Sequence, residues 1–175
     1  ALDPPPHSPQ RLLPYSIRIL EEVAPYICAV KLNRQLVLPL GLPKAGRLVK
    51  LIHDMNLPVI MDCKLNDVGH TNRAIAELYF NAGFDALTAN PFTGWEDGLQ
   101  PVFSLAQEMG RGILLLVYMS HRGASEGYGQ LVQDPKSGRP RPQYLLFAEK
   151  ALRWGADGVI VGATQPQRIR EVHSI

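Results

Sequence analysis

The sequence has few cysteines, no long hydrophobic run and almost no excess of either charge. Its two cysteines, Cys28 and Cys63, form no CxxC pair and lie in apolar, strand-like stretches, which argues against a metal site or a disulfide and predicts free, buried thiols in a reducing cytoplasm. No apolar run approaches the roughly 20 residues that cross a bilayer, and no signal-peptide pattern opens the sequence. The net charge of +2 is too small to indicate binding to nucleic acid or to a membrane.

The remaining composition is typical of one soluble globular domain, residues 1–175, in which 46% of residues are hydrophobic and 19% are charged. Gly83-Phe84-Asp85 and Gly155-Ala156-Asp157 repeat one pattern, in which a glycine ends a helical stretch and a strand follows. Strand-like runs alternate with helical periodicity, which predicts an α/β fold with a parallel sheet covered by helices. The predicted strands are 27–30, 59–61, 85–88, 113–117 and 158–161.

Two acids and a lysine follow the apolar run at 59–61, in the segment Asp62-Cys63-Lys64-Leu65-Asn66-Asp67. Side chains alternate between the two faces of a strand, so Asp62 and Lys64 are expected on one face and Cys63 on the other. Ionised side chains are rarely buried without a partner, and α/β folds place their chemistry at the carboxyl ends of strands. The pattern therefore indicates either a catalytic cluster or a structural ion pair.

The longer pattern Asp62-x-Lys64-x-x-Asp67-x-x-x-Thr71-Asn72 resembles the signature of the orotidine 5'-monophosphate decarboxylase family. Other segments that are similar to the family, in its order along the chain, are Ala1-Leu2-Asp3 (first strand), Val30-Lys31-Leu32-Asn33 (second-strand lysine) and Met119-Ser120-His121 (the serine loop after the fifth strand). Sister enzymes that act on sugar phosphates share Asp-x-Lys-x-x-Asp. Lys31, Thr71 and Ser120 therefore make the resemblance specific.

The resemblance implies a (β/α)8 TIM barrel rather than an open sheet. With residues 1–3 counted as the stub of a first strand, the chain holds about six βα units, the last with a helix expected over 166–172. The family's barrel has eight units. We therefore expect the two C-terminal βα units, which in the family carry a phosphate-binding glutamine loop and a Gly-Arg pair, to be missing from residues 1–175.

The activity that the resemblance implies is decarboxylation of orotidine 5'-monophosphate to UMP in pyrimidine biosynthesis, with no cofactor and no metal. Lys31, Asp62, Lys64 and Asp67 match the family's alternating Lys-Asp-Lys-Asp array. Removal of carbon dioxide leaves a carbanion at C6 with no carbonyl placed to delocalise it, so catalysis must come from electrostatics and a delivered proton. Lys64 is the expected proton donor.

The resemblance also implies how substrate and product are bound. Asp3 and Lys31 would contact the ribose hydroxyls, and Ser120 would read the pyrimidine edge. Asp67 and Thr71 would reach into the active site of a neighbouring subunit, so a homodimer is expected.

Several residues keep a plainer interpretation beside the functional one. Thr71 and Asn72 are also good helix N-caps. The histidines lack any ligand spacing and are expected on the surface or in loops: His7, His70 and His121. The glycine- and proline-rich segment 121–142 is either a solvated tether or a lid whose arginines approach an anionic ligand: Arg122, Arg139 and Arg141.

Two rival functions stay open at this stage. A keto-sugar-phosphate decarboxylase or aldolase of the sister group would need Mg²⁺ and a glutamate where this chain has Lys31, and an ammonium group there would repel the metal. A non-catalytic nucleotide-binding protein is the second rival. The complete set of acids and lysines argues against it.

Overall fold

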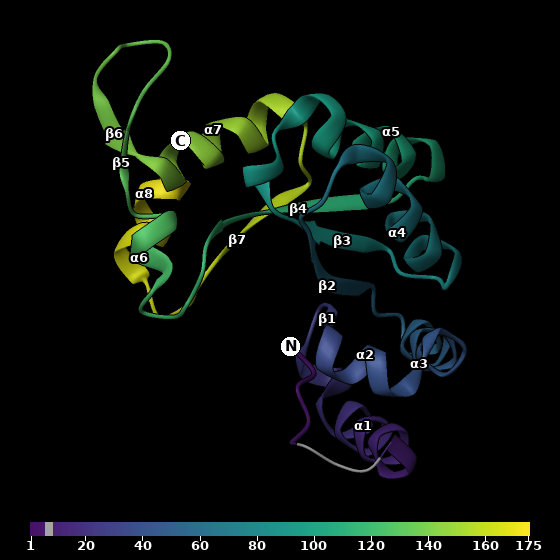
Figure 1. The fold of residues 1–175 in the computed structure, drawn as a ribbon. Coiled ribbons are helices and arrows are strands. Elements are labelled where there is room, and N and C mark those ends of the chain that lie inside the picture. Colours follow the sequence, from purple (N-terminus) through teal and green to yellow (C-terminus); the bar gives the residue numbers. More distant parts are fainter. Residues whose placement is uncertain (6–8) are drawn as a thin grey trace.

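A computed structural model describes residues 1–5 and 9–175, so His7 lies outside the described residues. Its centre is a parallel sheet in the order β1-β2-β3-β4-β7, which curls along its length (Figure 1). Leu2 forms an isolated parallel bridge to Leu32, which places residues 1–3 at the free side of β1, as predicted for a strand stub. The strands are β1 (Val30–Asn33), β2 (Val59–Leu65), β3 (Ala86–Ala89), β4 (Gly112–Tyr118) and β7 (Gly158–Val161).

Helices connect successive strands, and α3, α4 and α5 lie together on one side of the sheet (right in Figure 1). The α-helices are α1 (Pro9–Val23), α2 (Arg34–Leu40), α3 (Leu42–Asp54), α4 (Gly69–Asn81), α5 (Gln100–Met109), α6 (Ala124–Gly127), α7 (Gln143–Trp154) and α8 (Pro166–His173). As predicted, α5 and α7 end at glycines in the left-handed conformation, Gly110 and Gly155, where a side chain would strain the backbone. The predicted sixth helix is α8. No helix in the described ranges combines the length and apolar character needed to span a bilayer.

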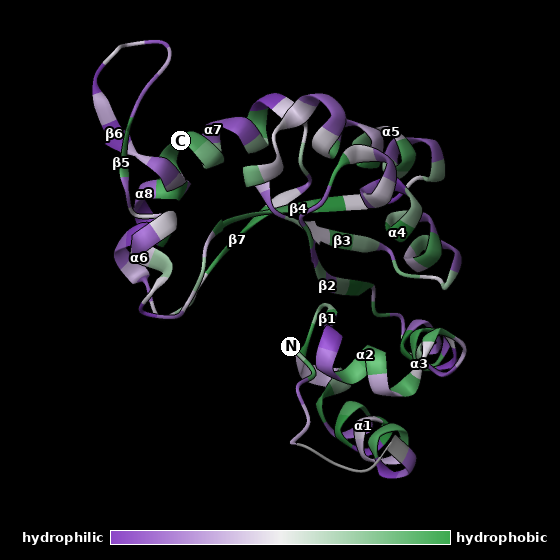
Figure 2. Cartoon of the chain, in the orientation of Figure 1, coloured by the Kyte–Doolittle hydropathy of each residue, from purple (hydrophilic) through white to green (hydrophobic). Residues whose placement is uncertain are grey.

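The core lies between the sheet and its helices. Strand residues such as Leu32, Met61 and Leu87 are fully buried, and Phe80 and Phe84 pack into the same cluster from the α4 side. Figure 2 shows β4 and β7 as largely hydrophobic strands and helices in which hydrophobic and hydrophilic residues alternate. Each large apolar side chain buried in this way stabilises the fold by roughly 1.5–3 kcal/mol. This layer fixes where the strands, and therefore their polar carboxyl ends, lie.

Two aspartates fasten the amino ends of the strands. The Asp85 amide donates to the Val59 carbonyl at 2.9 Å, and the Val59 amide donates back to the Asp85 carboxylate at 2.8 Å. Asp157 makes the same pair of bonds with Ile113, at 3.0 and 2.7 Å. The repeated Gly-x-Asp of the sequence is thus a repeated register lock between neighbouring strands, at the edge of the sheet opposite the carboxyl ends.

The structure corrects the predicted limits of two strands. Ala24–Tyr26 forms a 3-10 turn, so the chain joins the sheet only at Val30, whose amide donates to the Pro58 carbonyl at 2.9 Å. Cys28 is therefore exposed, and the prediction that it is buried was wrong. Strand β2 continues beyond 61 to Leu65, which brings Asp62 and its neighbours into the strand itself.

The segment 121–142 is folded, so its interpretation as a solvated tether was wrong. It contains α6 and an antiparallel hairpin of β5 (Leu131–Gln133) and β6 (Pro140–Pro142) that projects from the molecule (Figure 1). At the turn of the hairpin, hydrogen bonds from the Lys136 amide, Ser137 and Arg141 hold the pKa of Asp134 down to about 2. Arg141 also pairs with Glu149 of α7 at 2.6 Å. Its guanidinium is thus committed to the fold and not available as an anion ligand.

Candidate active site

Three charged side chains meet at the carboxyl ends of β1 and β2. Asp62 lies between two lysines: one carboxylate oxygen accepts a hydrogen bond from Lys31 Nζ, and the other accepts from Lys64 Nζ at 2.8 Å. Asp62 is only 8% exposed, whereas the lysine side chains are 24% and 30% exposed. The negative charge is thus sheltered, and the two positive charges are more exposed to solvent.

The electrostatic balance at Asp62 favours the charged carboxylate. Burial alone would raise its pKa, but hydrogen bonds from Lys31, Lys64 and Thr88, together with the charge of Lys31, outweigh burial and hold the pKa below its usual value. Cys63 points into the core, and burial raises the pKa of its thiol to about 12. The predicted separation holds, with a charged cluster beside an inert thiol.

A bulge in β2 shapes this cluster. Met61 pairs with Leu87 and Leu65 pairs with Ala89, so the three residues 62–64 of β2 face the single residue Thr88 of β3. Lys64 has a left-handed backbone with φ of +46°, which costs a non-glycine residue about 1 kcal/mol or more. Residues with strained backbone conformations cluster at functional sites, where the direction of the side chain is worth the cost in conformational energy.

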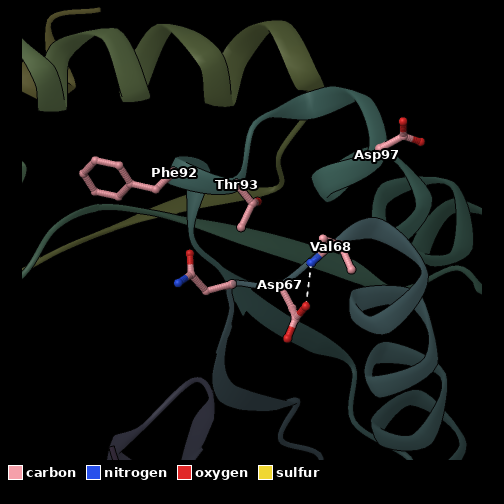
Figure 3. Close-up of a pocket in the computed structure, with 6 residues that line it drawn as sticks. Asp67, Val68, Phe92, Thr93 and Asp97 are labelled. Carbon is pink, nitrogen blue, oxygen red and sulfur yellow. Dashed lines mark hydrogen bonds between the residues drawn. The ribbon is translucent and has the colours of Figure 1, made fainter.

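Asp67 lies in the turn before α4, on one wall of a pocket of about 530 Å³ (Figure 3). Its carboxylate is exposed and accepts the Val68 amide at 2.7 Å. Within the described residues, neither Asp67 nor Thr71 bonds to the lysines, so one chain brings together Lys-Asp-Lys rather than four charges. The pocket is lined by Asn66, Asp67, Val68, Phe92, Thr93 and Asp97.

The N-cap alternative for Thr71 and Asn72 was wrong, because α4 begins at Gly69 after the cap residue Val68. Asn72 is fully buried, and its side-chain amide instead hydrogen-bonds to the backbone of Asp67. Its oxygen accepts the Asp67 amide at 3.1 Å, and its nitrogen donates to the Asp67 carbonyl and, at 3.2 Å, to the Gly98 carbonyl. Asn72 therefore fixes the turn that carries Asp67.

Replacement of Asn72 by alanine is expected to lower the free energy of unfolding by about 2 kcal/mol, because two backbone groups of Asp67 lose their partner in a buried setting. Hydrogen exchange should show faster opening of residues 66–68, with little change in β3 and β4. Asn81→Ala, at an exposed position in the last turn of α4, is the matched control. Unchanged exchange at 66–68 would contradict the role of Asn72.

Asp3 and Ser120 also lie at carboxyl ends, beside β1 and after β4. Gln35 donates to the Asp3 carboxylate at 2.6 Å. Ser120 is exposed, and its loop packs tightly against Gly162, where an added Cβ would stand 2.6 Å from the Ser120 Cα. Neither residue bonds to the Lys-Asp-Lys cluster among the described residues. Their proposed contacts with a ligand stay predictions.

The sequence interpretation missed two polar residues of the cluster. Asn33 accepts from Lys31 Nζ at 3.0 Å, and Thr88 donates to Asp62 at 2.9 Å. Asn33 is the last residue of β1 and Thr88 the last but one of β3, and a polar residue close to a strand end is the only signal that singles them out. His70 and His121 are exposed, as predicted.

A sequence model described as the "Orotidine 5'-phosphate decarboxylase / HUMPS family" matches residues 1–175. The chain belongs to this family. The resemblance inferred from the Asp-x-Lys-x-x-Asp pattern is thereby confirmed.

Similar proteins carry the same name. The orotidine 5'-phosphate decarboxylase of Thermomicrobium roseum is 36% identical over 92% of this chain. The Pyrococcus horikoshii decarboxylase structure is 30% identical with a TM-score of 0.73, and that of Methanocaldococcus jannaschii complexed with inhibitor BMP is 25% identical with a TM-score of 0.78. Both crystal structures cover 93% of this chain.

The chain spans 57% of the Thermomicrobium relative, between 57% and 66% of three such curated relatives, and 68% of each of the two crystal chains. Its curled parallel sheet with helices between the strands is part of the TIM-barrel fold of these orotidine 5'-phosphate decarboxylases, as predicted. In this chain the Lys31, Asp62 and Lys64 cluster stands at the end of the sheet where TIM barrels place their chemistry.

Proposed function

We infer that the protein decarboxylates orotidine 5'-monophosphate to UMP in pyrimidine biosynthesis. The observation that carries this proposal is the buried carboxylate of Asp62 between the ammonium groups of Lys31 and Lys64, in a chain of the decarboxylase family. The cluster combines a buried negative charge with two partly exposed cations. This arrangement suits a reaction whose transition state gathers negative charge on one carbon.

The reaction breaks the bond between C6 of the pyrimidine and its carboxylate. Carbon dioxide leaves, the electron pair of the broken bond stays on C6, and a proton from Lys64 Nζ forms the new C–H bond. The lysine then recovers a proton from water. Before the transfer, its positive charge stabilises the developing carbanion, so one group serves both electrostatic stabilisation and general acid catalysis.

The contacts of the two lysines support Lys64 as the donor. Lys31 Nζ is shared between Asp62 and Asn33, whereas Lys64 Nζ bonds only to Asp62 among the described residues. An ammonium has three protons to donate, so Lys64 keeps more of them for a substrate. In this proposal Lys31 and Asp3 bind the ribose hydroxyls, and Ser120 contacts the pyrimidine.

The fourth charge of the array would come from a second copy of the chain. Asp67 is exposed, and its pocket carries two apolar side chains about half exposed, Val68 at 52% and Phe92 at 51%. A homodimer that covers this surface would desolvate them and bring Asp67 and Thr71 to the neighbouring active site. Apolar side chains exposed around Asp67 support such an interface.

The rival Mg²⁺-dependent reaction on keto-sugar phosphates finds no support at Lys31. Its ammonium group is hydrogen-bonded to Asp62, and Lys31 matches the sequence position at which the resemblance implies a metal-binding glutamate in those enzymes. Within the described ranges, no three His, Cys, Asp or Glu side chains gather into a metal-binding group. Nothing in the site favours a purely nucleotide-binding role over catalysis.

The test is an assay of UMP formation from orotidine 5'-monophosphate, before and after exhaustive treatment with EDTA. We expect turnover that chelation changes by less than about twofold, because charge stabilisation comes from two lysines rather than from a cation. The same preparation assayed with a keto-sugar phosphate serves as the control. Loss of activity on chelation, with rescue by Mg²⁺, would overturn the proposal in favour of the sister reaction.

A further inference from the structure

One hydroxyl group connects the reactive part of β2 to β3. Thr88 Oγ1 donates a hydrogen bond to Asp62 Oδ1 at 2.9 Å and accepts one from the Lys64 backbone amide, also at 2.9 Å. The Thr88 carbonyl in addition accepts from the Cys63 thiol at 3.3 Å. A single residue of β3 therefore bonds to all three residues of the β2 bulge.

These bonds replace the regular ladder that the bulge interrupts. Pairing between β2 and β3 is lost after Met61 and resumes at Leu65, and in this gap the Lys64 amide donates to the Thr88 hydroxyl. Thr88 is 1% exposed, and water cannot easily substitute for its hydroxyl. Lys64 has a left-handed backbone, with φ of +46°. The hydrogen bond from its amide to the Thr88 hydroxyl stabilises this conformation.

We propose that Thr88 is a positioning residue for the decarboxylation, which orients the Asp62 carboxylate and the Lys64 backbone so that Lys64 Nζ is aimed at C6. The inference rests on the proposed function of the Lys31, Asp62 and Lys64 cluster. The Thr88 hydroxyl gives its single proton to Asp62 and accepts from the Lys64 amide, so it bonds to both of the residues that the chemistry needs. It is buried beneath them and acts through them.

Thr88 also affects the charge of Asp62. A hydrogen bond donated to a carboxylate favours its ionised form, so the hydroxyl adds to the effect of the two lysines in lowering the pKa of Asp62. Its removal raises that pKa. An exchange of threonine for valine keeps the shape of the side chain and removes only the hydroxyl, whereas serine keeps the hydroxyl.

The experiment compares Thr88→Val and Thr88→Ser in the full protein. We expect Thr88→Val to lower kcat by about 10- to 100-fold, the loss typical of a hydrogen bond to a charged group, with KM changed by less than about threefold. The acid limb of its kcat profile should move to higher pH. Thr88→Ser should retain kcat within about fivefold and keep the acid limb of the parent protein.

Carbon-13 NMR titration of the Asp62 carboxyl gives a readout that needs no turnover, with the pKa of Asp62 raised in Thr88→Val and not in Thr88→Ser. A parent protein that forms no UMP would refute the proposed function, and the titration would still report on Thr88. A parent protein that turns over, with a Thr88→Val variant of equal kcat and unshifted acid limb, would overturn the role of Thr88 alone. Equal losses in both variants would overturn it too, because packing rather than the hydroxyl would then be responsible.

Discussion

Replacement of Lys64 by alanine is expected to lower kcat/KM for orotidine 5'-monophosphate by at least about 10⁴-fold while the protein stays folded. The variant removes a charge that stabilises the carbanion and the proton that quenches it, and each effect alone accounts for about 10²-fold or more. Its stability should change by less than about 1 kcal/mol, because the Lys64 side chain is 30% exposed and alanine meets the same left-handed backbone. Thermal unfolding and steady-state kinetics measure the two quantities.

Two further variants sharpen this test. Lys64→Arg keeps the positive charge but offers a guanidinium that does not release a proton near neutral pH, so it should recover little activity if proton delivery is essential. Lys50→Ala, on the exposed side of α3, removes a lysine far from the cluster and should act like the parent protein. Turnover of the Lys64→Ala variant within tenfold of the parent would exclude Lys64 as the proton donor.

Replacement of Asp62 by alanine should affect both stability and chemistry. The two ammonium groups of Lys31 and Lys64 lose their shared partner and repel each other, at an expected loss of roughly 2 kcal/mol in the free energy of unfolding. Water that reaches the partly exposed lysines keeps this below the cost of a fully buried pair. Activity should fall by at least about 10²-fold, because Lys64 Nζ loses its only bonded carboxylate among the described residues.

The stability difference between the parent protein and Asp62→Ala should depend on pH in one direction. The pKa of Asp62 is lower in the folded protein than its unfolded value of about 3.9, so its contribution is fully present above that unfolded value and is lost as pH falls through the folded pKa. Plotted against pH, the free energies of unfolding of the two proteins should differ by a constant amount above about pH 5 and converge in stronger acid. A difference that grows on acidification would contradict the ion-pair role.

The same variant separates two ideas about Asp62. If its charge mainly repels the substrate carboxylate, its removal should tighten the binding of orotidine 5'-monophosphate even as turnover falls. If its charge mainly orients Lys64, substrate binding should stay unchanged or weaken. Binding of UMP, which lacks the carboxylate, is the reference in both cases and should be nearly the same in parent and variant.

The order of strands and helices was readable from the sequence because the strands are short, largely apolar runs and helices α5 and α7 end at glycine. The limits of β1 and β2 were not. The apolar residues 27–29 lie in a connecting segment between a 3-10 turn and β1. The polar residues Asp62 and Lys64 belong to β2, whose pairing with β3 contains a bulge. Local hydrophobicity cannot distinguish these cases, because pairing with a neighbouring strand decides both.

At the site, the sequence signalled the ionised residues and missed the neutral ones that hold them. Asp62 and Lys64 stand out because charge near a buried strand is rare. Thr88, Asn33 and Asn72 are common polar residues, and their importance comes from positions brought close only by the fold: Thr88 lies 26 residues along the chain from Asp62. The hairpin within 121–142 was hidden for a similar reason, since its glycines and prolines are equally typical of an unstructured loop.

The hydrogen bonds of Asp85 and Asp157 set the strand register at one end of the sheet and leave the other end to the candidate active site. They fix which strand residue meets which at the amino ends, through side chains supplied by the segments that enter β3 and β7. The loops at the opposite ends are therefore freed from setting register. In evolution, those loops can change in length and sequence, and substrate specificity can change with them, while the bonds of Asp85 and Asp157 keep the strands in register.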